Sequence, residues 1–114
     1  MKKIAVKILD TTLEATLLSP KVAKKYEEGI KGVVEKANEA QKLSSQADGI
    51  EMQCNAVIDF IDDVFGKGSA QKVFGEETDL LTCLEAYKQM TMLYPEQVNP
   101  HIKAISSSNT TGDA

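Results

Sequence analysis

The spacing of apolar side chains changes at Ser19-Pro20 from every second residue to every third or fourth, and this change restricts the fold most. Before it, apolar residues alternate with other residues over 4–8 and 13–17, a period typical of β-strands with one buried face. The turn-like segment Asp10-Thr11-Thr12 separates the two runs. We therefore predict a β-hairpin over residues 3–18. Because an isolated hairpin is marginally stable in water, it must pack against helices or pair with another chain.

The segment that begins at Ser19-Pro20 is predicted to be a long helix. The serine hydroxyl can accept a hydrogen bond from a free backbone N–H, and proline at the first helical position loses none. Gly29 and Gly32 lie inside this segment, where each costs about 1 kcal/mol relative to alanine. Two interpretations are open for them: close approach of another helix, or simple tolerance. The apolar stripe expected to be buried is Val22, Tyr26, Ile30, Val33, Val34, Ala37 and Leu43.

Further helical segments follow a predicted break over residues 44–49. Ser69 is expected to cap a short helix that ends at Gly75, and Thr78 or Asp79 to cap the next. That last helix should end near Pro95, leaving at most a short helical piece over 101–105. The predicted buried stripes are Ile50, Cys54, Val57, Ile58, Ile61, Val64 and Phe65 in the second helix, and Leu80, Leu81, Leu84, Tyr87 and Met90 in the last.

These segments predict a mainly α fold for the 114-residue chain, in which four to five helices follow the hairpin in a small bundle. One domain is expected over residues 1–105 and a disordered polar tail over 106–114. Cys54 and Cys83 fall at helical core spacing and are expected to stay reduced and buried. No apolar run approaches the ~20 residues needed to cross a bilayer, and no signal peptide is recognisable. We therefore expect no membrane partner and a cytoplasmic location.

The charged residues argue against nucleic acid as a partner and divide the chain into two halves. All thirteen fixed positive charges are lysines, against seventeen acids, so the net charge is −4. Proteins that read nucleic acids usually use arginine, which is absent here. Residues 1–47 carry a net charge of +3 and residues 48–114 a net charge of −7. This split indicates either two solvated faces or head-to-tail attraction between copies of the chain.

No arrangement of side chains in the sequence identifies an enzyme, a metal site or a cofactor site. His101 is the only histidine, so a histidine relay or a multi-histidine metal site cannot be built. Asp59, Asp62 and Asp63 share one side of a helix, and a solvated acidic face is favoured there over weak cation binding. The segment Gly66-Lys67-Gly68-Ser69 lacks the spacing of a phosphate loop. We therefore expect no catalytic residue and no cofactor.

The remaining candidates for function are partner contacts. Phe65 and Phe74 bracket the glycine corner, and either one would anchor a partner helix if it were exposed, although core packing is the default interpretation. Met90, with Met52 and Met92, would line an adaptable groove, although core filling is again the default interpretation for each. The candidate partner-binding residues are Phe65, Phe74, Met90, Lys24, Lys25 and Lys31.

One block of the sequence resembles a known family. The segment FIDDVFGKGSAQKVFG over residues 60–75, followed by LLTCLEAY over residues 80–87, resembles the small tail assembly chaperones of long-tailed bacteriophages and prophages of Gram-positive bacteria. Those proteins carry an (F/I)-D-x-V-F-G-x-G-(T/S)-A-x-x-(I/V)-F-G segment before a helix that begins with leucines and contains Cys-Leu-x-x-Tyr. The N-terminal hairpin followed by AKKYE over residues 23–27 also fits. The resemblance spans residues 3–94, and residues 60–87 carry nearly all of its specificity.

The resemblance implies a non-enzymatic chaperone that coats the helical tape measure protein and releases it as tail tube subunits polymerise. The implied partners are further copies of the chain in an open or spiral oligomer, the tape measure protein and the tail tube protein. The implied location is the host bacterial cytoplasm, with no copies in the mature virion. The alternative is a small structural or regulatory helical interaction module of a phage or prophage, which would form a stable monomer or closed dimer or stay in finished particles.

Overall fold

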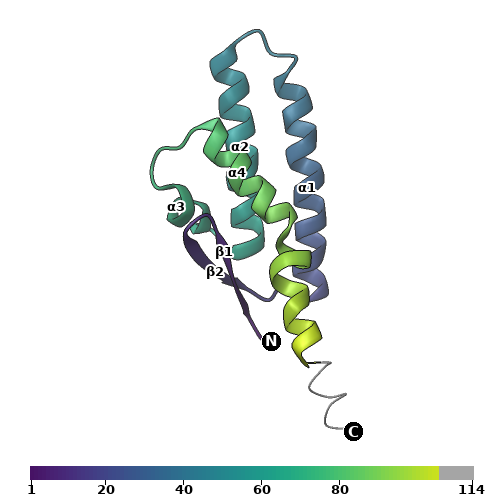
Figure 1. Cartoon of the computed structure of the whole chain (residues 1–114). Helices are drawn as coiled ribbons and strands as arrows, with labels where there is room; N and C mark the ends of the chain where they lie inside the picture. Colours follow the sequence, from purple (N-terminus) through teal and green to yellow (C-terminus); the bar gives the residue numbers. More distant parts are fainter. Residues whose placement is uncertain (106–114) are drawn as a thin grey trace, which may run out of the picture.

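The computed structural model describes residues 1–105 and confirms the predicted mainly α fold with an N-terminal hairpin (Figure 1). The prediction of a disordered tail over 106–114 lies outside the described residues. The elements are β1 (Ile4–Ile8), β2 (Thr11–Ala15), α1 (Pro20–Ala40), α2 (Gln46–Phe65), α3 (Ser69–Phe74), α4 (Leu80–Thr91) and the π-helical turn η1 (Tyr94–Val98). None of the helices described is both long and apolar enough to cross a membrane.

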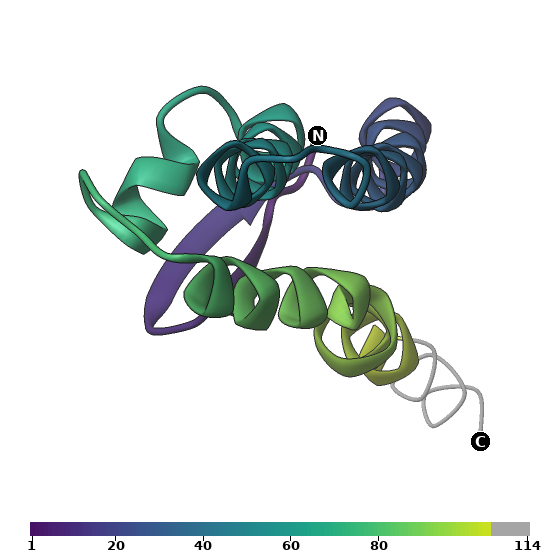
Figure 2. The same ribbon diagram turned by 90° about the horizontal axis from the view of Figure 1, so that it is seen from above.

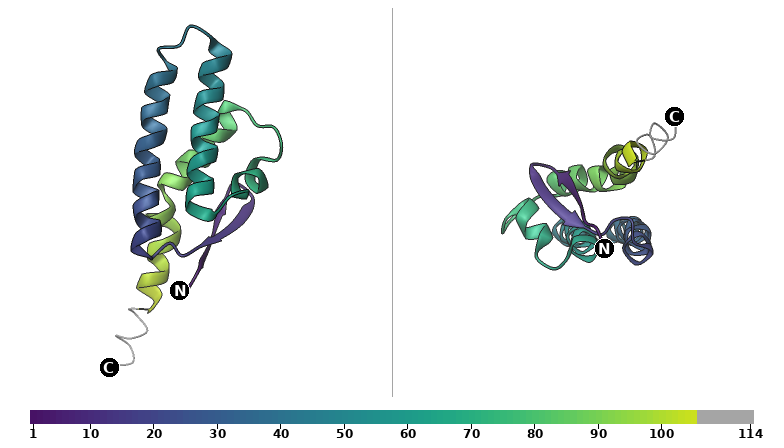
Figure 3. Two further views of the ribbon diagram at one scale, coloured as in Figure 1. Left: turned by 180° about the vertical axis from the view of Figure 1, so that it is seen from behind. Right: turned by 90° about the horizontal axis from the view of Figure 1, so that it is seen from below.

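The elements are arranged in two helical layers with the hairpin between them. Helices α1 and α2 run side by side in one layer, while α4 and the helical segment after it form the other (Figure 2). The hairpin fills the space between the layers near one end, and the loop end of α1 and α2 extends well beyond it (Figure 3). The largest fully buried side chains come from both layers and from the hairpin: Phe60, Ile8, Leu17, Ile61, Met90, Leu93, Val57, Val98 and Cys83.

The hairpin has a tighter turn than the sequence predicts. Ile8 pairs with Thr11, so the turn consists of Leu9 and Asp10, and the prediction of a turn at Asp10-Thr11-Thr12 is wrong. Leu9 has φ 53°, and its N–H donates to Gln89 Oε1 at 2.6 Å. A leucine with positive φ is strained. The two threonines instead belong to β2, because their β-branched side chains favour extended backbone.

Helices α4 and η1 cover the outer edge of β1. The Lys7 N–H donates to Gln97 Oε1 at 2.7 Å, and Gln97 Nε2 donates to the Lys7 carbonyl at 2.9 Å. Gln97 therefore satisfies both backbone groups of a residue that would otherwise present an open strand edge. At this edge the hairpin is supported by helices of its own chain.

Local caps place the starts of α1 and α2. Ser19 Oγ accepts from the Val22 N–H at 3.2 Å, which confirms the predicted start of α1. The predicted break over 44–49 is too long, because Ser45 Oγ accepts from the Asp48 N–H at 3.2 Å and α2 begins at Gln46. Gly49 is thus helical. A Cβ atom at Gly49 would lie 3.2 Å from the Ala40 carbonyl oxygen, so glycine permits the close approach of the two helices here.

The short helix α3 is capped by a side chain from α2. The prediction that Ser69 is its cap is wrong: Ser69 is the first helical residue, and the preceding Gly68 is left-handed with φ 93°. Asp62 Oδ1 accepts from the Ala70 N–H at 2.8 Å and so supplies the missing hydrogen bond. For α4, Asp79 is the cap, because its carboxylate accepts from the Thr82 N–H at 2.8 Å.

Several side chains predicted to be buried are exposed. Helix α4 buries Cys83, Ala86 and Met90, whereas Leu84 is exposed and Leu81 is 69 % exposed. The reason is that α4 turns a face centred on these three residues toward α2 and the hairpin. Val34, Leu43 and Ile50 are also exposed, because α1 packs mainly against α2 and the loop end of both helices extends beyond α4.

The chain stays helical past Pro95, further than the sequence predicts. Helix α4 ends at Thr91, but η1 and residues 99–105 continue the helical path. Pro95 lies in the first turn of η1, where a missing N–H costs no hydrogen bond. Leu93 and Val98 are fully buried, and Tyr94 Oη donates to the Leu17 carbonyl at 2.5 Å. Tertiary packing therefore stabilises a helical turn that Pro95 does not interrupt.

Candidate partner-binding groove

A groove of about 970 Å³ runs along the α1–α2 helix pair. Among the described residues, its lining comes from these two helices and the loop between them, with no residue of the hairpin, α3 or α4. We call it the α1–α2 groove. It is lined by Lys25, Glu28, Gly29, Gly32, Val33, Lys36, Leu43, Asp48, Glu51, Met52, Asn55, Ala56, Asp59, Phe60 and Asp63.

Gly29 lets Phe60 close the bottom of this groove. A Cβ atom at Gly29 would lie 2.3 Å from Phe60 Cδ1 and 2.6 Å from Cε1, so any side chain at this position would force the Phe60 ring or the helix to shift. The buried ring of Phe60 also packs against Tyr26 and Tyr87, with centroid distances of 5.8 and 6.1 Å. Close approach of another helix is therefore the correct interpretation of Gly29.

Gly32 has a different environment, because no atom lies within 4 Å of the position that its Cβ would take. Neither sterics nor a positive φ requires glycine here. The residue still lowers the stability of α1 by about 1 kcal/mol relative to alanine. A residue of low helix propensity that stands inside a helix without a structural reason is typical of functional sites. What Gly32 does provide is open space along the groove.

The floor of the groove is apolar and its two sides differ in charge. Met52 and Ala56 on α2 are half-buried and lie opposite Val33 on α1 in the lining. Methionine adapts its shape readily to a partner. The α2 side carries four carboxylates and no lysine, whereas the α1 side carries two lysines and one glutamate. The groove therefore combines an apolar floor with an excess of negative charge.

The setting of Asp59 in this groove changes its pKa. Burial raises the pKa of Asp59 above its ordinary value, and the neighbouring Asp63 and Asp62 raise it further. The three aspartates do not form one site, because Asp62 caps α3 while the other two line the groove. Within residues 1–105, no group of three His, Cys, Asp or Glu side chains is arranged to hold a metal ion.

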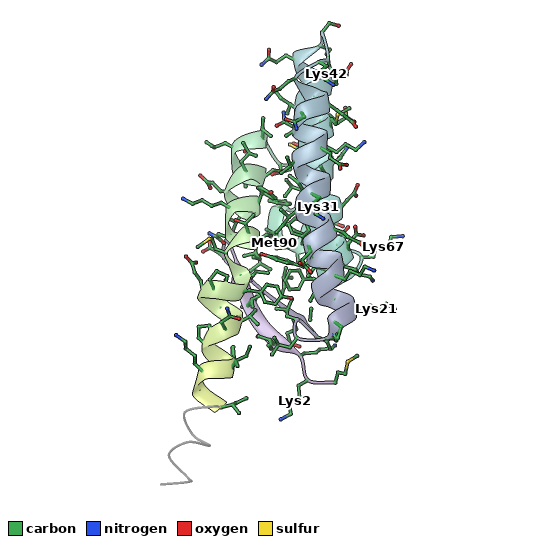
Figure 4. All side chains as sticks on the ribbon, turned by 90° about the vertical axis from the view of Figure 1, so that its right-hand side faces the viewer. Lys2, Lys21, Lys31, Lys42, Lys67 and Met90 are labelled. Atoms are coloured by element: carbon green, nitrogen blue, oxygen red, sulfur yellow. The ribbon has the colours of Figure 1, made fainter. Side chains whose placement is uncertain are left out.

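The structure removes Met90 from the predicted partner contacts. Its side chain has no exposed surface and lies between α4 and α1 (Figure 4). Its carbonyl accepts from Tyr26 Oη at 2.6 Å, so this residue joins the two helical layers. Met90 lies on the buried face of α4, which confirms its place in the predicted buried stripe and argues against a partner contact through its side chain.

Phe65 and Phe74 are half-buried and pack against the core, which is the default interpretation of these residues. Phe74 also lines a smaller hollow of about 460 Å³ beside the glycine corner.

The two cysteines are buried as predicted, and burial raises the pKa of Cys83 to about 11.

The three predicted lysines are all exposed on α1, but only Lys25 lines the groove. Lys24 lies outside the lining, and so does Lys31. Head-to-tail attraction between copies stays a prediction. Within one molecule, α1, with five of the nine lysines of the basic half, already packs beside acidic α2.

Sequence reasoning missed the groove as a unit, although parts of it were visible. Gly29, Gly32 and Met52 are candidates in the sequence, and so are Asp59 and Asp63, but the sequence does not connect them. Asp48 and Glu51 lie on the same side of α2 as Asp59, but the break predicted over 44–49 placed Asp48 outside the helix. The pairing of α1 with α2 is what brings these residues together.

The fold and groove are those of a small α-helical protein with an N-terminal hairpin and a candidate protein-binding surface. The chain belongs to the DUF6673 family, a family of unknown function, whose sequence profile covers residues 9–110. Comparisons with curated proteins and with solved structures found no significant match.

Proposed function

We propose that this protein is a non-enzymatic phage tail assembly chaperone that self-associates and binds the tape measure protein during tail assembly. The observation that carries the proposal is the α1–α2 groove, whose apolar floor is left open by Gly32. The second support is the resemblance over residues 60–87. A surface of this kind suits an amphipathic helix, which buries its apolar face in a groove between two helices.

The groove has the length of a client helix. The lining on α2 extends from Asp48 to Asp63, a rise of about 22 Å, which matches a partner helix of about 15 residues. Charged or polar residues line both sides of the floor. A contact of this size and polarity supports reversible binding better than a permanent interface. Reversibility is what a chaperone needs when tail tube subunits replace it.

The residues of the resemblance build the base of the groove. Phe60 closes its floor, and Asp62 caps α3. Gly66 and Gly68 have positive φ and form the corner between these helices, and Cys83 is buried where α4 meets α2. In the proposed function, this block therefore serves to hold α2 in position.

Self-association has a separate candidate surface. Leu81 and Leu84 on α4 are exposed one turn apart, and Met92 is exposed beyond them. Exposed apolar residues that share a helix face often mark an interaction surface. Because none of these residues lines the groove, one copy can contact another through α4 while its groove holds a client.

Co-expression with a tape measure fragment tests the proposal. We expect the fragment to be insoluble alone, and to be soluble and co-purify with the full chain. Gly32→Leu fills the groove and should abolish this rescue. The matched control is Asn38→Leu, which adds the same side chain at an exposed α1 position outside the groove. A fragment that stays insoluble with the unaltered chain would contradict the proposal.

Mass spectrometry of finished phage particles separates the two functions considered. A chaperone should be absent from purified particles after assembly. Detection of the chain at a fixed copy number in particles would instead support the alternative, a structural module of the phage.

A further inference from the structure

We infer that the α1–α2 groove selects amphipathic helices whose apolar face is flanked by lysine or arginine. This inference rests on the proposed function and adds the chemical class of the client segment. A cationic helix is expected because the lining contains five carboxylates and two lysines. The groove therefore attracts positive charge along its length.

The carboxylates are spread along the groove. On α2, Asp48 and Glu51 lie toward the loop end and Asp59 and Asp63 toward the base. The distance from Asp48 to Asp63 corresponds to about 22 Å of helix, the same length as the client helix considered above. A bound helix thus meets acidic groups over several turns, and its flank next to α2 is where basic residues are required.

The lysines of the chain do not neutralise this side of the groove. Within residues 1–105, the ion pair found within 4.0 Å joins Lys36 to Glu39, both on α1, at 3.3 Å. Lys25 lines the groove without an ion pair to Asp59 or Asp63. The carboxylates of α2 are consequently available to a cationic partner.

Mutual repulsion among the aspartates favours the same partner. The pKa of Asp59 is raised by burial and by the two nearby aspartates. A lysine or arginine placed beside Asp59 and Asp63 would stabilise their charged forms. A partner flanked by glutamate would add to the repulsion.

The groove of a second copy is a poor partner for this groove. Two grooves placed face to face would bring five carboxylates of each copy together, with two lysines from each. Like charges at this density oppose association. The exposed leucines of α4 offer copies of the chain a surface that avoids this repulsion.

Peptide binding to the full chain tests the inference. The probes are three fluorescent amphipathic peptides of about 18 residues with the same leucine face, flanked by lysine, glutamine or glutamate. Fluorescence anisotropy gives each dissociation constant at about 50 mM and about 300 mM NaCl, since screening weakens exposed charge pairs. We expect the lysine peptide to bind at least about tenfold tighter than the glutamate peptide, with an advantage that shrinks at high salt.

Two variants locate the effect. Asp59→Asn combined with Asp63→Asn should reduce the advantage of the lysine peptide several-fold and leave the glutamine peptide unaffected. The matched control is Glu76→Gln combined with Glu85→Gln, which removes the same charge from exposed positions outside the groove. Circular dichroism verifies that both variants fold. A salt-dependent preference in the unaltered chain supports the inference without reference to any variant.

Several results would overturn the inference. Equal affinity for lysine and glutamate peptides, a preference that is undiminished in the double aspartate variant, or binding of no peptide would each do so. Loss of self-association in Gly32→Leu would show that a second copy occupies the groove, which also overturns it. The solubility assay with the tape measure fragment decides the proposed function separately, because it does not depend on which flank the client carries.

Discussion

The ring of Phe60 lies directly against the backbone of Gly29, and this contact joins α1 to α2 at the floor of the groove. The contact explains why one helical glycine in this chain is required by packing while its neighbour, Gly32, is not. The two positions make opposite predictions for the same substitution.

Gly29→Ala should destabilise the protein by about 1–3 kcal/mol, because the added methyl group overlaps a buried ring and forces α1 and α2 apart. The gain in helix propensity, about 1 kcal/mol, offsets only part of this cost. Urea denaturation followed by circular dichroism measures the change. An unchanged free energy of unfolding would show that Phe60 moves aside without cost.

Gly32→Ala should stabilise the protein by about 0.5–1 kcal/mol, since alanine has the higher helix propensity and its methyl group meets open space. The same denaturation experiment measures this gain. Destabilisation would mean that the added methyl group meets a neighbouring group, contrary to the open space found at Gly32.

Alkaline pH should lower the melting temperature through Tyr26 and Cys83. Burial raises the pKa of Tyr26 from 10.0 to about 12 and that of Cys83 from 9.0 to about 11. The folded state favours the neutral form of both groups, so their contribution is fully present below pH 9 and is lost as pH rises to 12. Calorimetry across this range should show a steep fall that becomes shallower in Tyr26→Phe. An identical fall in that variant would exclude Tyr26 as a cause.

Both cysteines should react slowly with a thiol reagent at pH 8. Cys54 and Cys83 are buried, and the raised pKa of Cys83 leaves little thiolate. Reaction should become fast in denaturing urea, where both thiols are free. Fast reaction of one thiol in the folded protein would place that cysteine at the surface, contrary to the packing of α2 against α4.

Local signals predicted the ends of several elements correctly. Ser19 and Asp79 cap helices where the sequence predicts caps, because a cap depends only on a side chain and the backbone three residues on. The hairpin was predictable for a similar reason, since its alternation spans a few residues. The predicted position of its turn was wrong because Leu9 adopts a positive φ, a conformation that is unfavourable for leucine.

The candidate site was harder to predict than the elements. Leu81 and Leu84 follow the period of a buried stripe, yet they are exposed because α4 packs with its other face. Met90, which the sequence places both in the buried stripe and among the partner contacts, is fully buried. Helical periodicity identifies an apolar face, but which side is covered depends on where the neighbouring helices lie.

By itself, the sequence determined the order and type of the elements, the starts of α1 and α4, and the uneven charge of the two halves. Only the tertiary structure decided that α1 and α2 lie together, that Phe60 fills the space at Gly29 while Gly32 stays open, and that four carboxylates of α2 border one groove. The physical reason is range: propensities and caps act over a few residues along the chain. A groove instead arises from packing between residues as far apart in sequence as Lys25 and Asp63.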